Sequence, residues 1–326
     1  QTITLCGRQG LWREAVRVLR DAQKASAPGA VDVVTYSSAV TACRTSGEWR
    51  QALELLEEMQ GAGIRMDRIA YGAAMSACAM GGLWLRARSL LDEMRRVNLS
   101  PDVIAYSSAI KACAVEGRWE EALELLEGME NEGVKPNLIT YTGVVEACGR
   151  AGRWRKALWV LSRVRDNGLR PDTRLLTVVM DALARAGQTE KALELLQTMR
   201  PRPSSARTST STKSAASAKY TSSTAPQPVA SAHPQADLYT WNAAMTACTE
   251  GGKWEKTVGM LEDMRKDGLT PQTMNYNHAI RALGMGGRWE QAVDLLRDMK
   301  EHRVEPNRQS FHAMIEACGR GGCWER

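Results

Sequence analysis

A column of small or polar residues recurs along the chain and is a candidate for recognising a ligand by hydrogen bonding. Each member follows a residue, usually aromatic, that opens an apolar stripe. Because a quarter of all residues are charged, a column without Asp, Glu, Lys or Arg favours a shared role for its members. The members are Ser37, Gly72, Ser107, Thr142, Thr177, Asn242, Asn277 and His312.

A second column consists of Asp and Asn residues, all but Asp67 preceded by a proline, as in "GVKPNLITYT" from Gly133 to Thr142. Asp and Asn are favoured at helix N-caps because their side-chain oxygens accept backbone N–H groups that are otherwise unpaired. Capping is sufficient to explain this column, and a role in binding is the alternative. The column contains Asp67, Asp102, Asn137, Asp172 and Asn307.

Both columns belong to a repeat with a period of 35 residues, which several other columns share. In residues 103–137 a first apolar stripe has the i, i+3, i+4, i+7 spacing of an amphipathic helix, and it ends at Gly117. A second stripe with helical spacing follows and ends before Gly133 and Pro136. The period is marked by Trp49, Trp84, Trp119 and Trp154, and again by Trp254 and Trp289.

Each unit is therefore predicted to be a helical hairpin, which cannot bury its apolar face alone. Stacked hairpins can, so the predicted fold is all-α, a right-handed α-solenoid of helix-turn-helix repeats. Complete units are assigned to 33–67, 68–102, 103–137, 138–172, 238–272 and 273–307. A further unit runs from 173 to 199, and partial units occupy 1–32 and 308–326.

Residues 200–236 interrupt this pattern and are rich in Ser, Thr, Ala and Pro. Such a composition buries little apolar surface, so we expect a disordered insertion before the pattern resumes at Asp237. The insertion carries five basic residues and no acidic one, which leaves only +1 of the net charge of +6 for the rest of the chain. A nearly neutral solenoid gives weak support for a nucleic-acid partner.

Catalysis, metal binding and membrane insertion find no support in the sequence. Seven of the eight cysteines occupy one position of the repeat, which favours small buried packing residues over disulfides or a metal site. The four histidines form no H-x-E motif, and no apolar run is long enough to cross a membrane. We expect no enzyme activity, cofactor, metal or small-molecule substrate, although we take the chain to be a fragment that leaves a catalytic domain beyond its ends open.

The unit "VIAYSSAIKACAVEGRWEEALELLEGMENEGVKPN" resembles the pentatricopeptide repeat family, and the resemblance extends over nearly all of the chain outside 200–236. The tetratricopeptide repeat, with a period of about 34 residues, fits less well. The resemblance implies single-stranded RNA binding with about one base per repeat. It also implies a mitochondrion or plastid, where the protein would act in RNA processing, stability, editing or translation.

The resemblance further implies that the two columns act in pairs, one pair for each base. A hydroxyl with Asp resembles a guanine reader, a hydroxyl with Asn an adenine reader, and two amides a pyrimidine reader. Gly72 and Gln272 depart from the family pattern, so their bases are expected to be read poorly. The implied target is 5′-G-N-A-G-G-Y-Y-3′, read by Ser37 with Asp67, Gly72 with Asp102, Ser107 with Asn137, Thr142 with Asp172, Thr177 with Asp237, Asn242 with Gln272, and Asn277 with Asn307.

Two further groups are expected to support RNA binding. The second residue of each repeat would clamp a base by apolar contact, with ordinary helix-edge packing as the alternative: Val34, Ile69, Ile104 and Ile139. A basic strip late in the first helix would contact phosphate: Arg150, Arg185 and Arg320. A helical-repeat scaffold that binds protein segments is the alternative function, and the low charge of the repeats favours it slightly.

Overall fold

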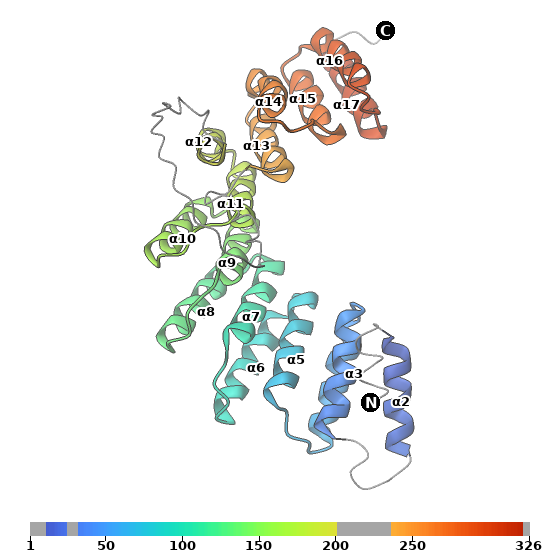
Figure 1. The fold of residues 1–326 in the computed structure, drawn as a ribbon, viewed down its shortest axis with the longest axis vertical. Helices are drawn as coiled ribbons and strands as arrows, with labels where there is room; N and C mark the ends of the chain where they lie inside the picture. The colour runs from blue at the N-terminus through green and yellow to red at the C-terminus, as the bar shows by residue number, and fades with distance from the viewer. Residues whose placement is uncertain (1–10, 25–31, 201–235, 322–326) are drawn as a thin grey trace, which may run out of the picture. The chain divides into compact units, whose positions relative to one another are not determined.

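The computed structural model describes residues 11–24, 32–200 and 236–321 of the chain, and in these residues all regular structure is α-helical (Figure 1). The predicted all-α repeat architecture is confirmed. The chain divides into two compact units, residues 1–182 and 183–326. The division falls inside one helix, α11 (Thr173–Arg185), and each unit is described by itself.

The first unit contains the helices of four complete hairpins, preceded by a single helix. In chain order these are α2 (Trp12–Lys24), α3 (Val33–Thr45), α4 (Trp49–Gly61), α5 (Arg68–Gly81), α6 (Trp84–Arg96), α7 (Val103–Glu116), α8 (Trp119–Asn131), α9 (Leu138–Arg150) and α10 (Trp154–Asp166). The second unit contains α12 (Thr189–Met199), α13 (Leu238–Glu250), α14 (Trp254–Lys266), α15 (Thr273–Met285), α16 (Trp289–Glu301) and α17 (Arg308–Arg320).

Within a hairpin, local sequence signals set the ends of both helices. Asp102 caps α7 by accepting a hydrogen bond from the backbone N–H of Ala105 at 2.9 Å. Gly117 ends the helix with a φ of 70°, in the left-handed region that glycine reaches without steric cost. The second helix, α8, ends where the N–H of Val134 donates to the carbonyl oxygen of Met129 at 3.0 Å. The hairpin is therefore encoded by its own 35 residues.

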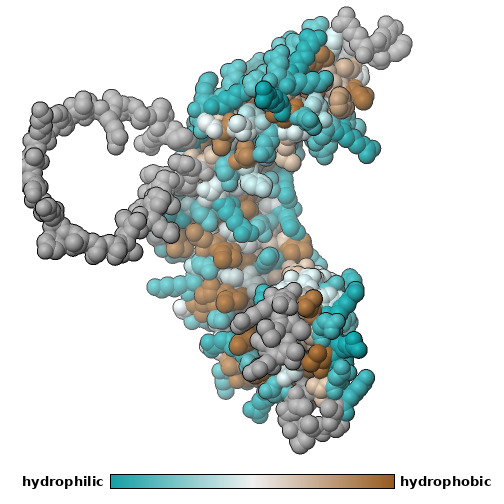
Figure 2. Space-filling model, turned by 45° about the vertical axis from the view of Figure 1, so that its right-hand side comes forward, coloured by the Kyte–Doolittle hydropathy of each residue, from teal (hydrophilic) through white to brown (hydrophobic). Residues whose placement is uncertain are grey.

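Stacking of hairpins buries the apolar stripes that the spacing predicts. Tyr106, Ile110 and Cys113 on α7 and Met129 after the turn are essentially inaccessible to solvent. First helices pack on first helices, α3 on α5, α5 on α7 and α7 on α9, and α4, α6 and α8 each contact the first helices of their own and the next hairpin. The interior is thus continuous within a unit, and hydrophilic residues dominate the face drawn in Figure 2.

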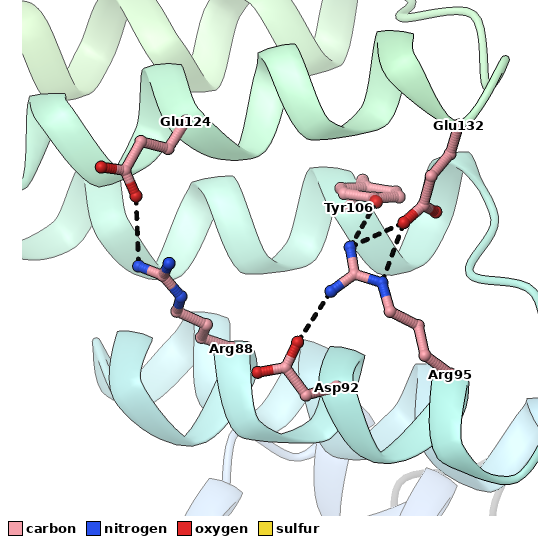
Figure 3. Close-up of polar contacts among 6 residues, drawn as sticks. All are labelled: Arg88, Asp92, Arg95, Tyr106, Glu124 and Glu132. Atoms are coloured by element: carbon pink, nitrogen blue, oxygen red, sulfur yellow. Dashed lines mark hydrogen bonds and ion pairs between the residues drawn. The ribbon is translucent and has the colours of Figure 1, made fainter.

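Polar side chains join the second helices of neighbouring hairpins (Figure 3). Arg95 on α6 hydrogen-bonds the hydroxyl of the buried Tyr106 at 2.8 Å and pairs with Glu132, which follows α8. Arg88 on α6 pairs with Glu124 on α8 at 3.2 Å. Each bond spans two consecutive repeats, so these contacts help to fix how one hairpin sits on the next.

The tryptophans that mark the repeat open the second helices and are half-buried. A Cβ added at Gly81, near the end of α5, would lie 2.8 Å from the ring of Trp49 on α4 of the preceding hairpin. Arg118 of the following repeat lies over the ring of Trp84, 5.1 Å from its centroid. These rings therefore fill the space between hairpins.

The ends of the predicted insertion belong to the folded part of the second unit. The N–H of Ala236 donates to the carbonyl oxygen of Met199 at 3.1 Å, the acceptor that the turn uses in other repeats. Arg200, counted above with the insertion, pairs with Asp263 and Asp267 on and after α14. The chain therefore leaves the folded hairpin after Arg200 and rejoins it at Ala236, beside the end of α12. The rest of the insertion, residues 201–235, lies outside the described residues.

Candidate nucleic-acid interface

The predicted reading residues of the first column occupy one structural position. Each is the fifth residue of the first helix of its hairpin, as Ser107 is of α7 and Thr142 of α9. Ser37 and Thr142 are buried, while Ser107, Thr177, Asn242, Asn277 and Gly72 are half-buried and His312 is exposed. Their side chains therefore lie at the edge of the packed interior, where a ligand could reach most of them.

The second column caps the same helices, as the structural interpretation predicts. The side-chain oxygen of each residue accepts from the backbone N–H three positions on: Asp67 from Ala70 at 2.7 Å, Asp102 from Ala105 at 2.9 Å, Asn137 from Thr140 at 2.9 Å, Asp172 from Leu175 at 2.8 Å, Asp237 from Thr240 at 2.8 Å and Asn307 from Ser310 at 3.0 Å. The cap uses one side-chain atom. A second oxygen or an amide nitrogen remains in each, so capping and base reading are compatible.

The two columns meet at the same end of the first helices, and hydrogen bonds join three of the predicted pairs. Asn277 Nδ2 lies 3.3 Å from Asn307 Oδ1 in a direct contact. Ser107 and Asn137 both contact Thr140, and Asn242 and Gln272 both contact Asn275. No hydrogen bond between members joins the pairs Ser37 with Asp67 and Thr142 with Asp172 in the part of the chain that the structure describes. Thr177 and Asp237 belong to different compact units.

An exposed apolar row accompanies the two columns, at the second residue of six of the first helices. Val34, Ile69, Ile104 and Ile139 are 64%, 68%, 64% and 69% exposed. Helix-edge packing therefore does not account for their apolar character. Tyr239 and Met274 hold the same position on α13 and α15 and are also exposed, although the sequence analysis did not include them. Their offset from the repeat start would have identified them.

The predicted basic strip engages other groups of the protein. Arg150 donates to the carbonyl oxygen of Val115 near the C-terminal end of α7, where a cation is favoured by the helix dipole. Arg320 pairs with Glu316 one turn earlier on α17 at 2.9 Å. Phosphate contact by Arg150, Arg185 and Arg320 stays a prediction, and Arg150 and Arg320 would have to exchange an existing partner for phosphate.

Burial keeps two titratable side chains of the first helices in their neutral forms. Burial and the nearby Arg281 lower the pKa of His278, the neighbour of Asn277, so its imidazole is uncharged at neutral pH. Burial also raises the pKa of the Cys113 thiol to about 12, so the thiol is protonated.

The described residues hold no group of three or more His, Cys, Asp or Glu side chains with the arrangement of a metal site. None of the described helices is long and apolar enough to span a membrane.

The stacked hairpins with repeated polar pairs define an α-helical repeat protein of the solenoid class. A family described as the pentacotripeptide-repeat region of PRORP matches residues 23–227, the PPR repeat family matches 271–320, and a pentatricopeptide repeat domain matches 233–285. The first match covers more than half of the chain. This chain therefore belongs to the pentatricopeptide repeat family.

Solved structures of the same family are similar to this chain. The crystal structure of the pentatricopeptide repeat protein PPR10 from maize is 26% identical with a TM-score of 0.70, and the match covers 96% of this chain and 40% of that one. PPR10 in complex with an 18-nt psaJ RNA element is 24% identical with a TM-score of 0.53 and the same coverage. This chain thus spans about 40% of the length of these proteins. Comparison with curated protein sequences finds no match.

Proposed function

We propose that this protein binds single-stranded RNA in a sequence-selective manner, with about one base for each repeat. The observation that carries the proposal is the recurrence of three groups at one end of most of the first helices. These are a half-buried hydroxyl or amide, a capping carboxylate or amide, and an exposed apolar side chain. Such a set can hydrogen-bond the edge of an unpaired base and contact its face. The complex of PPR10 with an RNA element supports the same class of ligand.

The hydrogen-bonding groups favour the base order inferred from the pairs. A capping Asp offers acceptors only, which suit the N–H donors of guanine, whereas a capping Asn also offers donors, which suit adenine or cytosine. The implied target is 5′-G-N-A-G-G-Y-Y-3′. We place the protein in a mitochondrion or plastid, acting in RNA processing, stability, editing or translation, and we assign no catalysis to the repeats themselves.

Selection from a random single-stranded RNA pool tests this function. Enriched RNAs should contain the implied target, with weak preference at the bases facing Gly72 and Gln272. Binding should weaken as salt rises, because phosphate contacts release counterions. Failure to enrich any sequence, with capture of a peptide segment instead, would favour the alternative scaffold function. The low charge of the repeats also favours that alternative.

A further inference from the structure

A buried polar residue of the following repeat contacts both members of three predicted reading pairs. This residue is the third of the next first helix: Thr140 on α9, Asn275 on α15 and Ser310 on α17. They are 0%, 1% and 0% exposed. Burying a polar side chain costs free energy unless it is hydrogen-bonded, so the hydrogen-bond partners of these residues indicate their role.

Thr140 links Ser107 to Asn137, the pair predicted to read adenine. The backbone N–H of Thr140 donates to Asn137 Oδ1 at 2.9 Å. Because a backbone N–H can only donate, this bond fixes which end of the Asn137 amide faces Thr140. The Thr140 hydroxyl lies 3.0 Å from the same oxygen and 2.8 Å from Ser107 Oγ.

Proton counting then assigns the direction of both hydroxyl bonds. Asn137 Oδ1 cannot donate, so the single hydroxyl proton of Thr140 goes to Asn137. With that proton on Asn137, Ser107 donates to Thr140 and its lone pairs are left as acceptors, one of the two directions that the 2.8 Å contact allows. The Asn137 amide nitrogen remains as a donor. The pair presents one donor and one acceptor, the complement of N1 and the N6 amino group of adenine.

A bridge at the same position recurs in the second unit, where the third residue donates to the reading residue. Asn275 Nδ2 donates to Asn242 Oδ1 at 2.6 Å, and its own Oδ1 accepts from the backbone N–H of Gln272 at 2.7 Å. Ser310 Oγ donates to Asn277 Oδ1 at 2.5 Å and lies 3.1 Å from Asn307 Oδ1. In both repeats the amide oxygen of the reading residue is already occupied. The amide nitrogen of the reading residue is then the group that can donate to another partner.

Two repeats with an apolar residue at this position behave differently. Ala70 stands opposite Ser37, and the buried Ser37 hydroxyl has no hydrogen-bond partner among the described residues. Leu175 follows Thr142, and the Thr142 hydroxyl bonds the carbonyl oxygen of Leu138 in its own helix at 2.7 Å. The bridging bond thus forms in three repeats where the third residue is polar and not in these two, where it is apolar, which associates the bond with the polar side chain.

We propose that the third residue of the following repeat is a positioning residue that fixes the hydrogen-bond polarity of the preceding reading pair. The proposal rests on the proposed RNA-binding function. It adds a third position to each pair, one that is buried and touches no base. Thr140 and Ser310 contact both reading side chains, and Asn275 contacts the side chain of Asn242 and the backbone of Gln272. Ala70 and Leu175 leave the first reading side chain without this constraint.

Thr140→Val is the decisive variant, because valine keeps the shape of threonine and removes the hydroxyl contacts with Ser107 and with the Asn137 side chain. It also removes the 3.4 Å bond that the hydroxyl accepts from the backbone N–H of Asn137. The backbone cap from residue 140 to Asn137 is retained, so α9 should still form. Binding is measured with four RNAs that differ only at the base facing Ser107 and Asn137. We expect the adenine-to-guanine affinity ratio to fall about fivefold or more, within the range of a base-edge contact. Thr140→Ser, which keeps the hydroxyl, should retain the ratio.

Two controls separate positioning from stability. Thr257→Val removes a buried hydroxyl on α14 that bonds the Lys253 carbonyl of its own helix, and it should leave every base preference unchanged. Ser310→Ala repeats the test in a second repeat. It introduces the residue that the chain already has at the equivalent position of α5, Ala70. It should weaken preference only at the base facing Asn277 and Asn307.

The outcomes distinguish this proposal from the proposed function. Wild-type protein that prefers adenine, together with a folded Thr140→Val variant of unchanged ratio and an inert Ser310→Ala variant, overturns the positioning role and leaves RNA reading intact. Wild-type protein that binds none of the four RNAs overturns the proposed function and the positioning role with it.

Discussion

Arg200 forms a bidentate ion pair with Asp267: Nε lies 2.8 Å from Oδ2 and Nη2 lies 3.1 Å from Oδ1. The guanidinium also contacts Asp263 at 2.9 Å and lies over the ring of the buried Trp241, 5.4 Å from its centroid. Arg200 follows Met199 as Arg95 follows Met94 and Arg265 follows Met264, and all three pair with an acid of the next repeat. The hairpin that carries the insertion thus makes the same bond to its neighbour as an ordinary hairpin.

Arg200→Ala should lower the stability of the second unit. The side chains of Arg200 and Asp267 are 27% and 12% exposed, so the loss leaves a mostly buried carboxylate without its partner. We expect a loss of about 1–3 kcal/mol in the free energy of unfolding, measured by urea denaturation. Arg297→Ala removes an ion pair to Asp294 whose side chains are 73% and 71% exposed, and it should change stability by less than about 1 kcal/mol. Equal effects of the two variants would contradict this account.

A cut within residues 201–235 should leave the two fragments associated. Ala236 bonds the carbonyl oxygen of Met199, and Lys253 and Lys256 on α14 pair with Glu190 on α12, so the closing contacts lie outside the cut segment. Limited proteolysis followed by size-exclusion chromatography under native conditions should give one peak that contains both fragments. Separation into two peaks would show that the chain connection, and not these contacts, joins α12 to α13.

Gly81→Ala should destabilise the first unit through the ring of Trp49. The added Cβ would lie within 2.8–2.9 Å of three ring atoms, closer than carbon atoms approach without displacement. Overpacking of this kind costs about 1–3 kcal/mol. Gly61→Ala meets nothing within 4 Å near the end of α4 and should be neutral or stabilising by up to about 1 kcal/mol. Thermal unfolding of the two variants beside the wild type measures the difference.

The buried cysteines should react slowly with alkylating reagents in the native protein. Burial raises the pKa of Cys78 and Cys148 to about 11, so little thiolate is present at pH 8. Labelling with iodoacetamide at pH 8 should be slow in the native state and fast in urea. Because the folded pKa lies above the unfolded value, the contribution of these thiols to stability is present below pH ~8.5 and is lost as pH rises towards 11. Rapid native labelling would place these thiols at an accessible surface.

Features that one repeat encodes alone were predictable from the sequence. The 3.6-residue spacing of Tyr106, Ile110 and Cys113 predicts the buried face of α7, and the Asp and Asn column predicts its caps, because both depend on residues near in the chain. Contacts between repeats were not predictable in this way. Thr140 does not stand out in a column that also holds Ala70, Ala105 and Leu175, because its role depends on Ser107, which lies 33 residues earlier in the preceding repeat. Arg150 resembles a phosphate ligand until its contact with Val115 is known.

Asn137→Asp tests whether the capping residue of "GVKPNLITYT" also reads a base. Asp and Asn are nearly equal as N-caps, and the Oδ1 that accepts from Thr140 N–H at 2.9 Å is present in both, so α9 should be little disturbed. The group left for a ligand changes from an amide N–H donor to a carboxylate acceptor. The pair then matches Ser37 with Asp67, and preference at that single base should move from adenine towards guanine.

The expected change is on the order of 1–3 kcal/mol between the two bases, the range of a base-edge contact. The measurement is the affinity of wild type and Asn137→Asp for RNAs that differ only at that position, at one fixed salt concentration. Asp102→Asn is the reciprocal control, because Gly72 provides no side chain to complete its pair and the substitution should change preference less. An unchanged adenine-to-guanine ratio in a folded Asn137→Asp protein would leave Asn137 as a helix cap alone. An adenine-to-guanine affinity ratio that changes only at this base would show that the Asn137 side chain caps the N-terminus of α9 with its oxygen and reads RNA with its nitrogen.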